Sequence, residues 1–294
     1  MGKKLAIWGD SITAQIFFAM GCDLATGGLL PPDFFWRRGL GGVMAPSLGL
    51  NITLLDHGTV EKAFCSEQRF ENEREIKRYR QQFGHAAGTV RWVEAGGQWW
   101  RPCEQALRSI ITQFDIVIVN FGLHYQQRPT ISAPEVGVYS RDLSLAVSAF
   151  ERAAFVEPQK RFVIVETAAQ HFRGTTRSGA FEERNPGAVD PDRCHCNPTG
   201  WELGWRNVAL HRAVSNATNT RLLPFYNLTQ PRWDMHVAHS TQQHAGDASI
   251  KPKPVCDCTH FCFDRSFWQH DFFPSLDSVL RGPPSKVLLT VSGK

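Results

Sequence analysis

The residues Gly9-Asp10-Ser11 stand where an apolar run passes into a helical pattern near the start of the chain. A serine hydroxyl is a weak nucleophile and needs a histidine base that is itself oriented by a carboxylate. With those partners, Ser11 would attack an acyl carbon and form a covalent acyl-enzyme. A second interpretation, in which Ser11 is only the N-cap of the helix, is preferred on this local pattern alone.

Two Asp-x-x-His spacings supply candidate partners, Asp192 with His195 and Asp257 with His260. Three residues make roughly one turn, so the two side chains of each pair can lie on one side. The first pair falls in a Cys- and Pro-rich stretch away from any expected strand end. The second pair shortly precedes the C-terminal helical segment, where the chain can return to the first strand. We therefore expect Asp257 to orient His260 and His260 to take the proton of Ser11.

Polar residues also follow the apolar run 115–122, which ends with Asn120, Gly122 and, just beyond it, His124. A side-chain amide and a glycine N–H at this place would hydrogen-bond a developing oxyanion. The alternative is a capped strand end with a buried core histidine. Glu166 and His171 follow the run 161–170, and there the structural interpretation is preferred.

These residues need a scaffold that brings several strand ends together. Strand-like and helix-like runs alternate along the chain, which predicts a three-layer, doubly wound α/β fold with a mostly parallel sheet and reactive groups at the carboxyl ends of strands. No linker or internal repeat divides the chain, so we expect one domain over residues 1–294 with a long Cys/Pro-rich loop at 172–200, followed by a polar, His- and Cys-rich segment at 229–262. Strands are expected at 4–9, 51–58, 89–96, 115–122, 161–170 and 221–227, and helices from residue 10 to about 21 and at 70–83, 103–114, 134–155, 200–218 and the end of 266–280.

The composition excludes some classes of function. The net charge of +4 is too small to indicate a nucleic-acid partner, and the basic stretch 74–82 is typical of a solvated helix face. No run of 18 apolar residues is present, so no transmembrane segment is expected in this chain. The first residues are too short for a secretory signal, so a leader or anchor would be missing from this sequence.

Eight cysteines and three Asn-x-Ser/Thr sequons, at Asn51, Asn216 and Asn227, nevertheless favour an oxidising lumen. We expect a protein of the secretory pathway, in the Golgi lumen or secreted. The spacings Cys194-x-Cys196 and Cys256-x-Cys258-x3-Cys262, beside His195 and His260, would also suit zinc. Disulfides are preferred, because no C-x2-C pair is present and zinc would leave Ser11 and Asp257 unexplained.

Six short motifs together resemble the PC-esterase branch of the SGNH/GDSL hydrolase superfamily. This branch includes plant trichome-birefringence-like polysaccharide O-acetyltransferases and the luminal domain of sialate O-acetyltransferases. The motifs are GDS at 9–11, NFGLHY at 120–125, ETAAQHF at 166–172, WRNVALH at 205–211, RWDMH at 232–236 and DCTHFC at 257–262. The sequence departs from the plant pattern at LHYQ, where a Trp-Trp is usual, and it has no separate Gly block between 22 and 100.

The resemblance implies a single SGNH-like domain in which Ser11 is the nucleophile, His260 the general base and Asp257 its orienting acid. It also implies an oxyanion hole formed by Ser11, Asn120 and Gly122. Candidate substrate-binding residues are His124, His171, Arg206 and His236.

The implied function is a serine-dependent O-acyl, most simply O-acetyl, esterase or acetyltransferase that acts on a glycan. It needs neither a metal nor a cofactor, and the partner is a carbohydrate or acyl-ester substrate. The sequence leaves open whether water or a sugar hydroxyl accepts the acyl group. Two other classes are also open: a catalytically silent glycan-binding module and a zinc-stabilised interaction domain.

Overall fold

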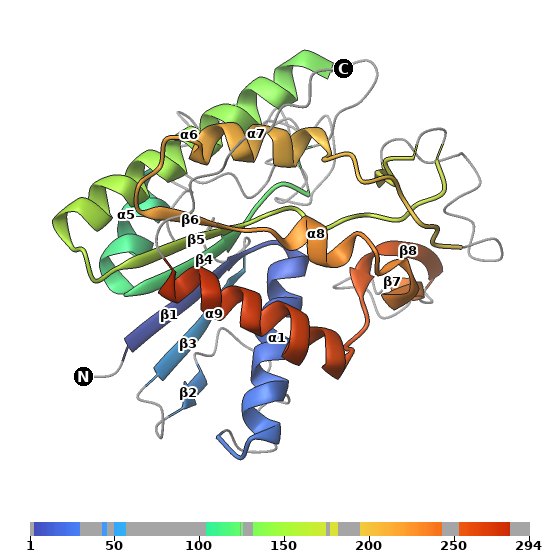
Figure 1. Cartoon of the computed structure of the whole chain (residues 1–294), viewed down its shortest axis with the longest axis horizontal. Helices are drawn as coiled ribbons and strands as arrows, with labels where there is room; N and C mark the ends of the chain where they lie inside the picture. The colour runs from blue at the N-terminus through green and yellow to red at the C-terminus, as the bar shows by residue number, and fades with distance from the viewer. Residues whose placement is uncertain are drawn as a thin grey trace, which may run out of the picture.

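A six-stranded sheet forms the centre of the chain, with the strand order β2-β3-β1-β4-β5-β6 (Figure 1). The computed structural model describes residues 3–29, 43–45, 50–56, 104–123, 125, 132–174, 177–181, 195–242 and 253–282. The strands are β1 (Lys3–Gly9), β2 (Val43–Ala45), β3 (Leu50–Asp56), β4 (Ile116–Asn120), β5 (Arg161–Val165) and β6 (Thr220–Leu223). The edge strand β2 is antiparallel to β3, and the other neighbouring strands are parallel. The chain therefore has the predicted α/β class, with a mostly parallel sheet.

Helices cover both faces of this sheet because the side chains of each strand alternate between them. In β1, Ala6 and Trp8 pack in one cluster with α5 (Glu104–Gln113), α6 (Ser132–Val156) and α7 (Trp205–Val214). Leu5 and Ile7 pack in a second cluster with α1 (Ser11–Thr26) and α9 (Phe273–Arg281). Burial on both faces explains why β1, β4 and β5 are almost continuously apolar in sequence.

The strand order reverses between β1 and β4. From β1 the chain continues to β3 on one side, whereas β4, β5 and β6 follow on the other. In open parallel sheets, the connections diverge at such a reversal and leave room for a ligand. Ser11 directly follows β1, and Asn120 is the last residue of β4.

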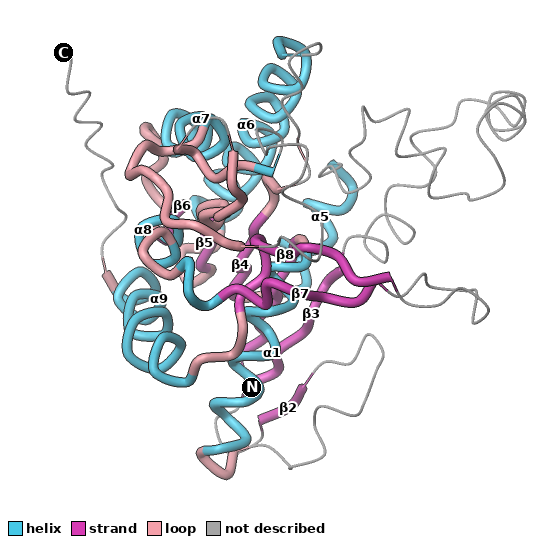
Figure 2. Tube along the Cα trace, turned by 90° about the vertical axis from the view of Figure 1, so that its right-hand side faces the viewer, coloured by secondary structure: helices cyan, strands magenta, loops and turns pink. Residues whose placement is uncertain are grey.

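The segment 229–262 contains a β-hairpin that the sequence did not predict. Strands β7 (His236–Gln242) and β8 (Lys253–Phe261) form a separate two-stranded antiparallel sheet. Figure 2 shows this pair beside α1, at the end of the main sheet. Its strands are polar and lack an apolar alternation, and a disulfide from Cys258 to Cys196 joins β8 to a segment 62 residues earlier. The local sequence pattern therefore does not indicate these two strands, and the disulfide that joins β8 to Cys196 is a long-range contact.

Element boundaries also differ from the prediction near residue 224. The expected strand 221–227 ends at Leu223, and Phe225–Thr229 forms the short helix α8. Pro224 lacks an N–H for a strand ladder and stands at the N-cap of α8. A π-helical segment, Phe267–Phe272, leads into α9, and α7 is shorter than the predicted 200–218.

Several expectations lie outside the described residues. These are the helix at 70–83, the strand at 89–96, residues 182–194 of the loop expected at 172–200, and His124. Within the described part, no helix has both the length and the apolar character needed to cross a membrane.

Candidate active site

The step from β1 into α1 requires its glycine. A Cβ added to Gly9 would lie 2.0 Å from the carbonyl oxygen of Asn120 and 2.2 Å from Oγ1 of Thr13. Asp10 has extended backbone angles, and its Oδ1 accepts a hydrogen bond of 3.0 Å from the N–H of Ile12. Asp10 is therefore the N-cap of α1. This leaves the Ser11 hydroxyl, which lies on an exposed residue, available for other partners.

Ser11 is joined to the Asp257–His260 pair of β8. Nε2 of His260 lies 2.6 Å from Oγ of Ser11, and Nδ1 of His260 lies 2.8 Å from Oδ2 of Asp257. A carboxylate accepts only, so Nδ1 carries the proton and Nε2 is free to accept one from the hydroxyl. The three residues therefore form the predicted hydrogen-bonded chain, although 249 positions separate serine from histidine.

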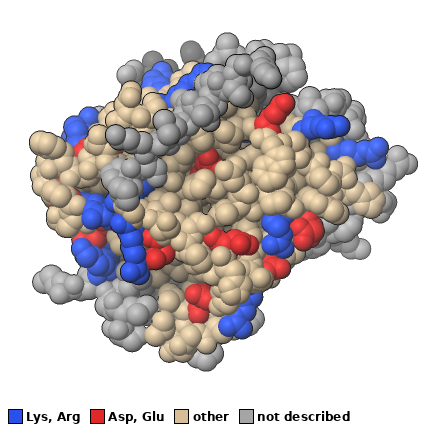
Figure 3. Space-filling view, viewed as in Figure 1, with Lys and Arg blue, Asp and Glu red and all other residues tan. Residues whose placement is uncertain are grey.

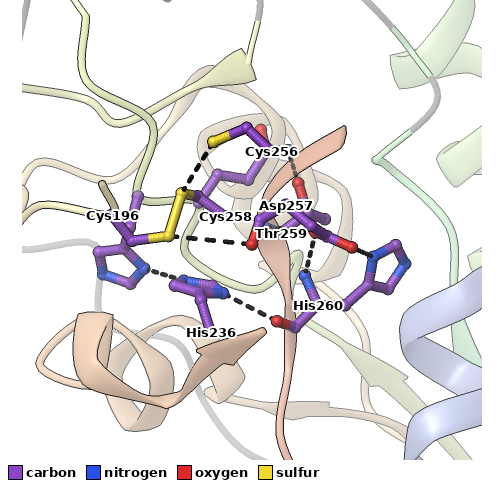
Figure 4. Close-up of a disulfide and its surroundings, with 9 residues drawn as sticks. Cys196, His236, Cys256, Asp257, Cys258, Thr259 and His260 are labelled. Carbon is purple, nitrogen blue, oxygen red and sulfur yellow. Dashed lines mark hydrogen bonds and ion pairs between the residues drawn. A yellow bond between two sulfur atoms is a disulfide. The ribbon is translucent and has the colours of Figure 1, made fainter. Parts of the chain in front are cut away.

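Both carboxylate oxygens of Asp257 accept hydrogen bonds from nearby residues of the same strand, β8. Oδ1 accepts from the backbone N–H groups of Thr259, at 3.1 Å, and His260, at 3.0 Å, while Oδ2 accepts from the imidazole (Figure 4). Burial alone would raise the pKa of Asp257, but the hydrogen bond and charge of His260 and these N–H groups lower it. Asp257 is therefore a fixed anion beside the imidazole.

The pairing with Asp257 shifts the pKa of His260 in the opposite direction. Burial alone would lower the pKa of His260, but the hydrogen bond and charge of Asp257, together with the charge of Asp10, raise it above 6.5. A raised pKa makes the imidazole a stronger base, and it also means that the base is available only at higher pH.

Asp10 is a second acidic group near this histidine, and the sequence analysis did not single it out. Its side chain is almost fully buried, and Oδ2 has no hydrogen-bond partner among the described residues. Burial raises its pKa to about 6, although N–H groups of Ile12, Thr13 and Leu123 and the charge of His260 act in the other direction. Near neutral pH, Asp10 is thus a poorly compensated buried charge.

Asn120 is placed differently from its expected role as an oxyanion donor. Its Nδ2 donates to the carbonyl oxygens of Val165, at 3.2 Å, and Glu166, at 2.9 Å. These two acceptors match the two N–H groups of the amide, so in this conformation Asn120 joins the ends of β4 and β5. The N–H of Ser11, in the first turn of α1 where no intrahelical acceptor exists, is a better candidate donor.

Gly122 is constrained by its surroundings on the same edge. A Cβ there would lie 2.2 Å from Oγ1 of Thr167, and its carbonyl accepts from Nε of Arg206 at 2.8 Å. Arg206 is buried and also donates to the carbonyl of Tyr125. These contacts tie Arg206 to the backbone of Gly122 and Tyr125, just after β4.

His171 and His236 form a buried pair behind His260. Nδ1 of His171 lies 2.5 Å from Nε2 of His236; the outer nitrogens lie 2.8 Å from the carbonyl of Gln230 and 3.0 Å from that of His260. Each of the two carbonyls requires an N–H, and the contact between the rings requires a third. The two rings together therefore need three protons, which makes one of them a charged imidazolium. Burial opposes this charge, because it lowers the pKa of His171 and brings that of His236 to about 4. His236 therefore supports the backbone of His260, and His171 supports His236.

One disulfide lies directly behind the candidate acid. Cys196 and Cys258 are bonded to each other (Figure 4). Cys256 is also disulfide-bonded, so both neighbours of Asp257 are cross-linked. Cys22 and Cys262 carry free thiols. Oxidation removes three of the candidate zinc ligands. In the described part of the chain, no three His, Cys, Asp or Glu side chains gather closely enough to hold a metal ion.

Acidic and basic side chains of the described residues are interspersed on the face drawn in Figure 3. A scan against models of known protein families finds none that matches the chain, and no curated protein matches it. The geometry of the site is therefore the basis for any functional assignment.

Proposed function

We propose that this chain is a serine-dependent O-acyl esterase or acyltransferase of the SGNH type, in which Ser11, His260 and Asp257 act as nucleophile, base and orienting acid. One observation carries the proposal: the continuous hydrogen-bonded chain from Asp257 through His260 to Ser11, at 2.8 and 2.6 Å. Its serine directly follows β1, beside the point where the strand order reverses, and open α/β sheets bind ligands at such a reversal. The exposed serine and partly buried carboxylate suit nucleophilic catalysis.

The reaction proceeds in two steps. Oγ of Ser11 attacks the acyl carbon while its proton passes to Nε2 of His260, and the imidazolium then protonates the departing alcohol oxygen. In the second step, His260 takes a proton from water or a sugar hydroxyl, whose oxygen attacks the acyl-enzyme. The imidazolium then returns a proton to Oγ as Ser11 departs, which restores the free enzyme. Asp257 stays ionised throughout and stabilises the imidazolium.

The resemblance of the six motifs to the PC-esterase branch supports an acetyl ester of a glycan as substrate. The disulfide between Cys196 and Cys258 supports an oxidising compartment, in keeping with our proposal of a secretory-pathway location. Turnover measured in water alone and with an added sugar decides which of the two accepts the acyl group.

A chromogenic acetyl ester, with and without a carbohydrate acceptor, tests the proposal. Ser11→Ala and His260→Ala should each lower kcat by at least about 10³-fold, because nucleophile and base act as a unit. His195→Ala is the matched control, since His195 is an exposed residue of the alternative Asp-x-x-His pair and should retain near-wild-type turnover. Thermal melts establish that every variant is folded. Turnover that survives Ser11→Ala, or that is lost in His195→Ala alone, would refute the assignment.

A further inference from the structure

Gln15 makes a two-point contact with the strand that carries His260. Its Nε2 donates to the carbonyl oxygen of Phe261 at 2.7 Å, and its Oε1 accepts from the N–H of Phe261 at 3.2 Å. Gln15 follows Ser11 by four residues on α1, so the two side chains lie on the same helix face. Phe261 follows His260 directly in β8.

This contact completes an edge of the hairpin. In the two-stranded sheet, Phe261 is the register partner of His236 on β7. The N–H and C=O of one strand residue point to the same side, and those of Phe261 point to Gln15 on α1 rather than to a third strand. A carboxamide has both a donor and an acceptor, so it satisfies an edge residue as another strand would.

Other contacts at His260 come from the hairpin itself. Asp257 accepts from both the backbone N–H and Nδ1 of His260, and His236 donates to its carbonyl. These contacts fix the imidazole relative to β7 and β8, whereas Ser11 belongs to α1. The relative position of helix and hairpin therefore sets the 2.6 Å distance between Nε2 and Oγ. Gln15 joins helix to hairpin one turn from the serine and one residue from the histidine.

We infer that Gln15 is a positioning residue that holds Ser11 and His260 within proton-transfer distance. This inference rests on the proposed function, and it assigns Gln15 no direct contact with the acyl group. Misplacement of reacting groups by about 1 Å costs about 10²-fold in rate. Loss of the two hydrogen bonds should therefore affect kcat more than KM.

Gln15→Met tests the inference, because methionine preserves length, helix propensity and apolar contact but removes both hydrogen bonds. The matched control is Gln269→Met. Nε2 of Gln269 donates to Oδ1 of Asp23, so it also joins α1 to a distant segment, but at the far end of the helix from Ser11. The measurements are kcat and KM for the chromogenic acetyl ester, the rate at which a fluorophosphonate probe labels Ser11, and the melting temperature.

We expect Gln15→Met to lower kcat and the labelling rate by about 10- to 100-fold with KM changed less than threefold. Gln269→Met should stay within about twofold of wild type in kcat and labelling rate, as tethers at the far end of α1 do not set the reacting distance. If Gln15→Met does not fold, Gln15→Asn is used, since it keeps the amide but shortens its reach and should show the same loss. An active wild type with unchanged kcat in the folded Gln15 variant, or equal losses in both methionine variants, would overturn the inference alone. A wild type with neither Ser11-dependent turnover nor labelling would overturn the proposed function with it.

Discussion

Asp10→Asn should make the protein more stable at alkaline pH while weakening the candidate base. Asn is as good an N-cap as Asp, so the bond to the N–H of Ile12 is retained. The substitution removes a charge that is almost fully buried and has an unpartnered Oδ2. Burial raises the pKa of Asp10 from 3.8 to about 6.

The size of the effect follows from this pKa difference. At about 1.4 kcal/mol per pKa unit, ionised Asp10 destabilises the folded chain by about 3 kcal/mol. An Asn amide N–H2 without a partner costs about 1–3 kcal/mol of this gain, which leaves a net gain of up to about 2 kcal/mol. The folded chain binds the proton more tightly than the unfolded chain. The cost of Asp10 is therefore fully present above pH 6 and disappears as pH falls to about 4.

Urea unfolding of wild type and Asp10→Asn at pH 8 and pH 4 measures this difference. Asp257→Asn is the matched control with the opposite sign, because the pKa of Asp257 is lowered on folding and its charge stabilises the native state. The charge of Asp10 also contributes to the raised pKa of His260, so the acid limb of the esterase rate should move to lower pH in Asp10→Asn. An Asp10→Asn variant that is less stable than wild type at pH 8, with unchanged slope in urea, would refute the reasoning.

Three further predictions follow from other contacts. The rate of acyl-ester hydrolysis should fall on acidification with a midpoint above pH 6.5, because His260 must be neutral to act and Asp257 raises its pKa. A pH series of kcat/KM checks this, and a midpoint below 6 would contradict it. Burial alone would raise the pKa of Glu151, but hydrogen bonds from residues 218 and 220 lower it to about 2. Glu151→Gln should therefore cost about 1 kcal/mol of stability near neutral pH after solvent screening. This loss should vanish as pH falls from 4.5 towards 2, and urea unfolding measures it; equal stability of the two proteins at pH 7 would exclude the effect. Replacing both Cys196 and Cys258 by Ala should destabilise the chain by about 2–5 kcal/mol, because the disulfide between them is lost. Thermal melts without reductant measure this, and an unchanged melting temperature would show that the bond does not stabilise the fold.

The sequence by itself determined the class of fold and the chemical identity of the candidate triad. Apolar runs that bury both faces, separated by helical patterns, predict a parallel α/β sheet because local hydrogen bonding and side-chain alternation dictate them. The position of Ser11 directly after such a run, and the three-residue spacing of Asp257 and His260, are likewise local properties. These were sufficient to name the three residues that the structure brings together.

Only the tertiary structure decided which surrounding groups support the triad. The hairpin of β7 and β8 depends on long-range contacts, among them the Cys196–Cys258 bond, and its strands carry no apolar alternation. Asn120 has the residue type of an oxyanion donor, but its amide meets two carbonyls at the end of β5. The bond from Gln15 to Phe261 spans 246 positions, and the sole local signal is the four-residue spacing from Ser11. The physical reason is that the residue type fixes only which hydrogen bonds a side chain is able to make. The fold decides which partner lies within reach, and that partner decides the role of the side chain.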